Sequence, residues 1–158
     1  MPGVNLSRAE AAARSAHLKV DSYLVELDLT TGAEVFRAKT TVKFSSSKPG
    51  SETFIDAVGR TLHSATLNGV ALDKSVFDGE SVHLKNLAAE NILVVDLDAI
   101  YSTSGEGLHR FVDPADSEVY LYSQFEVADS RRVYACFDQP DLKAKFSLTT
   151  VAPSNWQI

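Results

Sequence analysis

Residues 23–44 read YLVELDLTTGAEVFRAKTTVKF, and the side chains suited to a core recur there at every second position on both sides of Gly32. These positions are Tyr23, Val25, Leu27 and Leu29 before the glycine, and Phe36, Ala38, Thr40, Val42 and Phe44 after it. Successive side chains of a strand point to opposite faces, so a period of two predicts strands that are buried on one face. With a glycine turn between them, the two strands predict an antiparallel hairpin.

The intervening positions of this hairpin carry opposite charges on its two strands. Glu26 and Asp28 lie on the first strand, and Lys39 and Lys43 lie on the second. We expect them to pair across the strands, each pair adding at most a few tenths of a kcal/mol.

Further turn signals follow at short and regular intervals. They are Pro49-Gly50, Asn68-Gly69 and Asp78-Gly79. The segments between them predict strands at 53–57, 61–67, 82–84 and 91–101, the last of which is apolar enough at 92–95 to be buried on both faces. This spacing is typical of antiparallel sandwiches, so the sequence predicts a mainly β fold, an antiparallel β-sandwich.

Two short helical segments interrupt this pattern. Ser7-Arg8-Ala9-Glu10 matches a capping box before an alanine-rich stretch, which predicts a helical lead-in over 1–16 and a domain over 17–158. Asp129 is placed to cap a helical turn near 129–136, which Pro140 would end. A last strand is expected from residue 144 to 150.

The composition excludes several classes of protein. The 158 residues include 15 Lys and Arg against 21 Asp and Glu, a net charge of −6, which is the wrong sign for binding nucleic acid. The longest aliphatic run has four residues, Ile92 to Val95, too few to cross a membrane, and the start has no signal-peptide pattern. A single cysteine, Cys136, fits a reducing compartment, and we expect it to be buried and unreactive. The location indicated is cytoplasmic.

The residues alone predict no complete catalytic site in this chain. The four histidines are scattered, so no pair has the spacing of a zinc-binding helix, and no nucleophile elbow or phosphate-binding loop is present. The strand near 119–126 is more informative, because Tyr120, Tyr122, Gln124 and Glu126 would share one face. Gln124 and Glu126 would then stand about 7 Å apart and converge on one ligand group, although the same pattern also suits the solvated face of an edge strand.

Three spaced motifs resemble those of a known family. They are GLHR at 107–110, YSQFE at 122–126 and DSRRVYACFDQPD at 129–141. In this order they resemble the closing part of the N-terminal domain of zinc aminopeptidases of the aminopeptidase N family, gluzincins related to the leukotriene-epoxide hydrolase. The sequence departs from that family at His109, where many members have tyrosine, and at Gln139, where many have an acidic residue.

The resemblance implies both a fold and a role. It implies a saddle-like β-sandwich that packs on a thermolysin-like catalytic domain, which we expect after residue 158 and which would bind the zinc. The parent enzyme would remove N-terminal amino acids from peptides, while this fragment alone would be inactive and bind no metal. By position in the matched strand, Glu126 would anchor the α-amino group of the substrate and Gln124 would line the pocket for the first residue. Peptides and the catalytic domain would be its partners, with no nucleic acid and no membrane.

The chemistry of these two residues agrees with that assignment. An exopeptidase must recognise an ammonium group, and an ionised carboxylate such as Glu126 provides a charge-assisted hydrogen bond. The carbonyl oxygen of Gln124 could accept from the same ammonium or orient the substrate backbone. For Tyr120 and Tyr122, and for the ion-pair cluster of Arg131 and Arg132 with Asp129 and Asp138, we expect structural roles. The alternative to the aminopeptidase hypothesis is a stand-alone β-sandwich module that binds a sugar, peptide or protein surface without catalysis.

Overall fold

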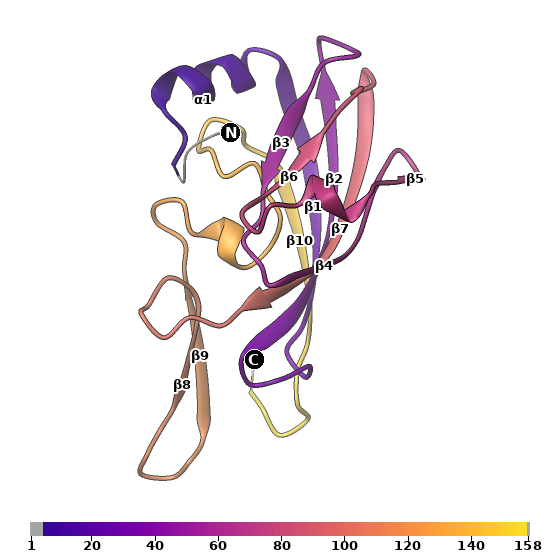
Figure 1. Ribbon diagram of the computed structural model, residues 1–158. Helices are drawn as coiled ribbons and strands as arrows, with labels where there is room; N and C mark the ends of the chain where they lie inside the picture. Colours follow the sequence, from indigo (N-terminus) through magenta and orange to yellow (C-terminus); the bar gives the residue numbers. More distant parts are fainter. Residues whose placement is uncertain (1–4, 158) are drawn as a thin grey trace.

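The computed structural model describes residues 5–157 and consists mainly of β-strands (Figure 1). Along the chain the elements are α1 (Arg8–Ser15), β1 (Leu18–Asp28), β2 (Val35–Ser46), β3 (Thr53–Asp56), β4 (Thr61–Leu67), β5 (Val70–Ala71), η1 (Lys74–Val76), β6 (Ser81–Leu84), β7 (Glu90–Ile100), β8 (Gly107–Val112), β9 (Val119–Gln124), η2 (Ser130–Arg132) and β10 (Lys145–Val151). The predicted mainly β fold with a short N-terminal helix is therefore confirmed. No helix among the described residues is long and apolar enough to cross a membrane.

A six-stranded sheet in the order β10-β1-β2-β7-β4-β5 forms the body of the molecule. Its strand pairs are antiparallel except β1 and β10, which run parallel. Two strands joined by a tight turn must run antiparallel. β1 and β10 are the first and last strands of the chain, so no tight turn joins them and they can run parallel. Two smaller sheets, β3 with β6 and β8 with β9, complete the fold.

The predicted hairpin of residues 23–44 is present as β1 and β2. Val25 lies opposite Thr40 and Leu27 opposite Ala38, and all four side chains are buried. The predicted charge pairs form only in part. Lys39 contacts Glu26 at 3.6 Å, whereas Asp28 lies opposite Arg37 in the register, and Lys43 lies opposite Ser22.

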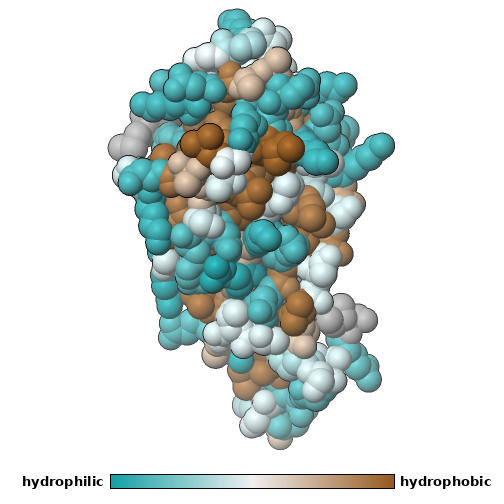
Figure 2. All heavy atoms as spheres, turned by 90° about the vertical axis from the view of Figure 1, so that its right-hand side faces the viewer, coloured by the Kyte–Doolittle hydropathy of each residue, from teal (hydrophilic) through white to brown (hydrophobic). Residues whose placement is uncertain are grey.

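The core lies on one face of the six-stranded sheet, and β7 shows this clearly. The side chains of Leu93 and Val95 are buried in this strand, but that of Ile92, directly before Leu93, is 48% exposed. The prediction that 92–95 is buried on both faces is therefore wrong. Antiparallel sheets commonly have one solvated face, and the apolar run does not change that. On the side of the molecule where β5 lies, polar side chains surround several apolar ones (Figure 2).

The predicted turn at Asn68-Gly69 joins β4 to β5. Asn68 has φ 54° and Gly69 has φ 80°, so both central residues adopt the left-handed conformation that a type I′ turn requires. The capping box is also confirmed, since the side chain of Ser7 accepts from the Glu10 main chain and that of Glu10 accepts from Ser7. The first four residues of the predicted lead-in lie outside the described residues.

Helix α1 is attached to the body through Arg14. The guanidinium donates to Asp56 at 3.0 Å and to Gln139 at 2.9 Å, and it lies over the rings of Phe54 and Phe137. The side chain of Gln139 in turn donates to a main-chain oxygen of α1, that of Ala11. A single buried cation therefore joins the lead-in helix, strand β3 and the segment that precedes β10.

Candidate functional site

The two predicted site residues lie at the end of strand β9. Strand β9 stops at Gln124, and residues 126–129 form a turn that is closed by a hydrogen bond from Asp129 N to Phe125 O. The predicted strand through Glu126 is therefore two residues too long. Both Gln124 and Glu126 are exposed, so neither is turned into the core.

A hydrogen bond joins these two residues directly. The side-chain oxygen of Gln124 accepts from the main-chain nitrogen of Glu126, with 2.5 Å between the atoms. One lone pair of this oxygen is thereby engaged, while its second lone pair and the NH₂ group of Gln124 remain available to a ligand. The geometry therefore allows both roles expected for Gln124, accepting from an ammonium and orienting a carbonyl oxygen.

Glu126 lies at a cavity of about 490 Å³. The walls of this cavity, which we call the small cavity, include the aromatic residues Tyr23, Phe125, Tyr134 and Phe146 beside polar ones such as Asp138. Burial raises the pKa of the Tyr134 phenol to about 12 and raises the pKa of the Asp138 carboxyl above its usual value. Both groups line this cavity, so the exposed carboxylate of Glu126 lies at the rim of a space whose walls include partly buried polar groups.

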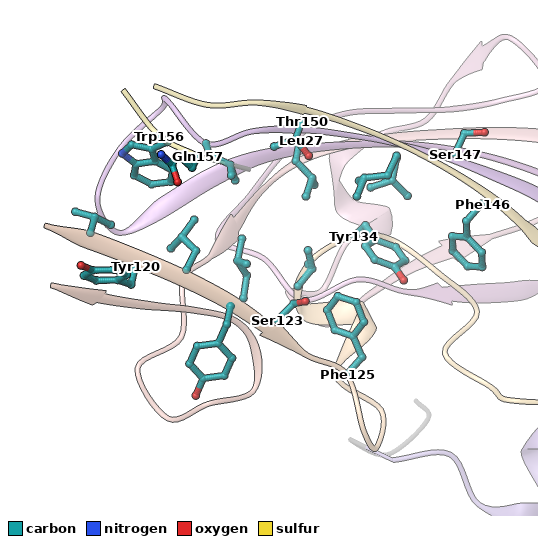
Figure 3. A pocket seen from close by; sticks show the side chains of 18 of the residues that line it. Leu27, Tyr120, Ser123, Phe125, Tyr134, Phe146, Ser147, Thr150, Trp156 and Gln157 are labelled. Carbon is teal, nitrogen blue, oxygen red and sulfur yellow. The ribbon is translucent and has the colours of Figure 1, made fainter. Parts of the chain in front are cut away.

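A second and larger space of about 930 Å³ adjoins the small cavity, and we call it the groove (Figure 3). It lies between the β8–β9 hairpin on one side and β1 and β10 on the other. Tyr120 and Tyr122 border the groove, while Phe125, Tyr134 and Phe146 line both spaces. Gln124 lines neither, so only Glu126 of the predicted pair borders a concave surface.

Comparison with known proteins identifies the family of this domain. The family model of the peptidase M1 N-terminal domain matches residues 19–157. The chain belongs to this family. It is 52% identical to an aminopeptidase N of Streptomyces lividans over 162 residues, which cover all of this chain and 19% of that protein. The chain thus spans about a fifth of the length of this curated relative.

Solved structures share the fold at low sequence identity. The aminopeptidase A of Legionella pneumophila, solved in complex with aspartic acid, superposes on 86% of this chain with a TM-score of 0.71 and 18% identity, over 16% of its own length. An M1 zinc metallopeptidase of Deinococcus radiodurans, solved as a mutant bound to a Tyr-Ser-Ala substrate, superposes on 85% of this chain with a TM-score of 0.62 and 19% identity, over 32% of its own length.

In this M1 N-terminal domain the departure at Gln139 has a structural explanation. Its side-chain oxygen accepts from Arg14 and its side-chain nitrogen donates to Ala11. A carboxylate at this position has no hydrogen to donate, so it would lose the bond to Ala11. Sequence reasoning missed Arg14 altogether, because an arginine in the last turn of an exposed helix carries no signal of burial.

The ion-pair cluster near the site is present in part. Arg132 contacts Asp129 at 2.7 Å, and the main-chain nitrogen of Arg131 donates to Asp138 at 3.1 Å. Asp129 makes no capping hydrogen bond to η2, so that prediction is wrong. The reason is that its carboxylate accepts from the Arg132 guanidinium three residues later.

Cys136 is buried as predicted, and burial raises the pKa of its thiol.

No metal centre can be assigned to this part of the chain. Among residues 5–157, no three His, Cys, Asp or Glu side chains are grouped so that they could hold an ion. The candidate site is a carboxylate and an amide at the end of β9, and the carboxylate borders a partly aromatic cavity.

Proposed function

We propose that this chain is the N-terminal domain of a zinc aminopeptidase and that Glu126 anchors the α-amino group of the peptide substrate. The domain comprises residues 17–158, preceded by the helical lead-in 1–16. The observation that carries the proposal is the exposed carboxylate of Glu126 beside a partly aromatic cavity, in a chain of the peptidase M1 N-terminal domain family. The 52% identity to an aminopeptidase N supports a peptidase as the parent protein.

The physical argument concerns the charge of a peptide's free end. An ammonium that leaves water for a partly apolar site needs an ionised acceptor, and a hydrogen bond to a charged group contributes about 1.5–3 kcal/mol. Glu126 provides the charge, and the free NH₂ of Gln124 donates to a carbonyl oxygen of the same substrate. A blocked amino terminus would offer no cation, so this pair selects for substrates with a free first residue.

We assign the zinc of the parent enzyme to residues outside this chain, because the described residues do not group ligands for it. When bound, the metal lowers the pKa of a water molecule so that it can attack the first peptide bond. The contribution of this domain is to hold and orient the amino terminus. The 158 residues alone are accordingly expected to release no amino acid from a peptide.

The test is a kinetic comparison in the parent enzyme. Glu126→Gln removes the charge but keeps the shape, and leaving a bound ammonium without its partner costs about 2–5 kcal/mol, a decrease in kcat/KM of roughly 30-fold to several thousandfold. Glu90→Gln changes an exposed carboxylate at the start of β7 that lines neither the groove nor the small cavity, and as the matched control it should change kcat/KM less than twofold. Equal values for both variants would remove Glu126 from the site.

A second candidate function is a stand-alone binding module without catalysis. The open groove of about 930 Å³ favours it, since a large apolar groove on a complete domain is usually a binding site. The two functions differ in one simple observation. A gene product that ends with this domain and releases no amino acids from peptides supports the module, and one that continues into a peptidase supports the aminopeptidase.

A further inference from the structure

The three sequence motifs of the family meet at the turn that carries Glu126. Gly107 begins the first motif and lies opposite Gln124 of the second in the register of β8 and β9. Asp129 begins the third motif and is the last residue of the turn, and Arg132 of the same motif is the last residue of η2. Residues from three separate stretches of the sequence therefore surround one short turn.

The position of the Glu126 carboxylate depends on the main chain of this turn, because the side chain is exposed. A hydrogen bond from Asp129 N to Phe125 O at 3.1 Å closes the turn over residues 126–129. Val127 within the turn is 82% exposed and therefore adds little packing. The contacts that hold Phe125 and Asp129, the two ends of the turn, thus determine where the carboxylate lies.

The end of the turn at Asp129 is held by an ion pair with η2. The side chain of Asp129 is 12% exposed, and its Oδ1 accepts from Nε of Arg132 at 2.7 Å, a charge-assisted hydrogen bond. The main-chain nitrogen of Arg132 also donates to Asp129 O at 3.1 Å. Helix η2 is in turn attached to the body of the domain, because Val58 N donates to Arg131 O at 2.8 Å. Asp129 is thereby fixed relative to the rest of the domain.

The other end of the turn is held by the same segment of the chain. The ring of Phe125 packs edge-on against that of Tyr134, with 5.9 Å between the ring centroids (Figure 3). Tyr134 is fixed to η2, since its main-chain nitrogen donates to Ser130 O at 3.1 Å. Residues 130–134 thus contact both ends of the turn, and their place in the fold determines that of Glu126.

Gly107 provides the space in which the side chain of Arg132 lies. A Cβ added to Gly107 would lie 2.8 Å from Cβ of Arg132 and 3.4 Å from its Cδ, and the φ of 65° at Gly107 also favours glycine. The aliphatic part of Arg132 therefore packs against bare main chain at the position opposite Gln124. This packing restricts the side chain whose guanidinium pairs with Asp129.

We propose that Gly107, Asp129 and Arg132 are positioning residues, which hold the turn so that the carboxylate of Glu126 meets the substrate ammonium. This inference rests on the proposed function, because it concerns the role of Glu126. The three residues act through the turn and make no contact with the substrate themselves. A shift of about 1 Å in a group that positions a substrate can lower the rate about 100-fold, so a turn held at both ends contributes to the reaction.

Hydrogen exchange in the full-length parent protein tests whether the ion pair holds the turn. Arg132→Met removes the charge and keeps most of the aliphatic chain, so the amide of Asp129 should exchange at least about 10-fold faster than in the wild type. Arg37→Met is the matched control. Arg37 pairs with Asp96 on the solvated face of the six-stranded sheet, with side chains 38% and 18% exposed against 43% and 12% for Arg132 and Asp129. It should leave the exchange of Asp129 unchanged, and equal exchange in the two variants would overturn the proposal.

Kinetics of the parent enzyme test whether this hold acts through Glu126. We expect Arg132→Met to lower kcat/KM about 10-fold or more when Glu126 is present, and less than about twofold when it is added to Glu126→Gln. A mere loss of folded enzyme would lower kcat/KM by the same factor in both backgrounds, which would overturn the proposal. Arg132→Lys keeps the charge, so kcat/KM should decrease less in Arg132→Lys than in Arg132→Met.

Two glycines test the packing against Arg132. Gly107→Ala adds a Cβ that displaces the Arg132 side chain, and the amide of Asp129 should exchange faster in this variant. Gly105→Ala is the control, because Gly105 also has a positive φ, 103°, but its added Cβ would meet the hydroxyl of Tyr122 at 3.3 Å. It should leave the exchange of Asp129 unchanged. Equal exchange in both variants would contradict the role of Gly107.

The two proposals fail in different measurements. Faster exchange of Asp129 in Arg132→Met together with unchanged kinetics of Glu126→Gln would support the held turn while rejecting Glu126 as the anchor. A lower kcat/KM in Glu126→Gln together with unchanged exchange in Arg132→Met would keep the anchor and reject the positioning residues.

Discussion

The hydroxyl of Tyr23 accepts a hydrogen bond from the main-chain nitrogen of Phe137 at 3.0 Å, in a part of the core where Tyr23 is 2% exposed. This bond joins β1 to the segment that forms a wall of the small cavity. Tyr23→Phe removes only the oxygen and leaves the N–H of Phe137 without a partner. We expect a loss of about 1–3 kcal/mol in the free energy of unfolding, measured by urea denaturation. Tyr122→Phe, at an exposed position, is the control, and its free energy of unfolding should decrease by less than about 0.5 kcal/mol.

The bond between Gln124 and Glu126 predicts different effects for two substitutions at residue 124. Gln124→Met removes the acceptor for the Glu126 main chain, whereas Gln124→Glu keeps an acceptor and adds a charge. In the parent enzyme we expect Gln124→Met to reduce kcat/KM by roughly 3- to 10-fold, the equivalent of one neutral hydrogen bond. If Gln124 only positions the turn, kcat/KM should decrease less in Gln124→Glu than in Gln124→Met. A larger loss in Gln124→Glu would mean that its NH₂ group contacts the substrate.

Arg14 predicts a large effect on stability. Its side chain is 3% exposed and that of Asp56 is 7% exposed, so removing the cation leaves a buried carboxylate unpaired. Arg14→Met is expected to cost about 3–5 kcal/mol in the free energy of unfolding. Arg8→Met, on the exposed side of the same helix, is the control and should cost less than about 0.5 kcal/mol. A similar small loss in both variants would show that the buried pair does not hold α1.

Asp138 predicts a pH dependence of stability. Burial is the main cause that raises the pKa of its carboxyl above the unfolded value, so the folded protein binds this proton more tightly. The contribution of Asp138 to the free energy of unfolding is therefore fully present below the pKa that its carboxyl has in the unfolded chain. This contribution is lost as the pH rises through the higher pKa of the folded protein. Asp138→Asn does not titrate, so the difference in melting temperature, variant minus wild type, should increase between pH 3.5 and about pH 6. A difference that stays constant over this range would contradict the shift.

Two glycines predict opposite effects of alanine. Gly69 has φ 80°, where an added Cβ strains the backbone, and nothing else lies within 4 Å. Gly69→Ala should therefore cost about 1–2 kcal/mol in the free energy of unfolding. Gly32 does not need a positive φ, and its added Cβ would make an ordinary contact at 3.6 Å with Val35 O. Gly32→Ala should be neutral or stabilising by up to about 1 kcal/mol.

The sequence predicted the local features of this fold well, because their causes are local. The alternation in 23–44, the Asn68-Gly69 turn and the Ser7 capping box all depend on residues a few positions apart. The parallel pairing of β10, the exposure of Ile92 and the burial of Arg14 depend on contacts between distant segments. A period of two reveals which side chains share a face, but it does not reveal which face or which neighbouring strand is covered.

The same distinction applies to the site. The motif at 122–126 predicted Gln124 and Glu126 on one face of a strand; both residues are exposed in the structure, but the strand stops at Gln124. It did not predict that Gln124 would bind the main chain of Glu126, because the strand ends and turns between them. Whether Glu126 meets a substrate ammonium stays a prediction, and the kinetics of Glu126→Gln decide it.

The bond between Arg14 and Gln139 joins positions 125 residues apart. A helix of eight residues is too short to be stable alone in water, so α1 depends on this partner. At a translation rate of about 5–20 residues per second, the ribosome needs roughly 6–25 seconds to add the intervening chain. During that interval α1 lacks one of the two hydrogen-bond partners of its buried cation, and Gln139 is made only shortly before β10.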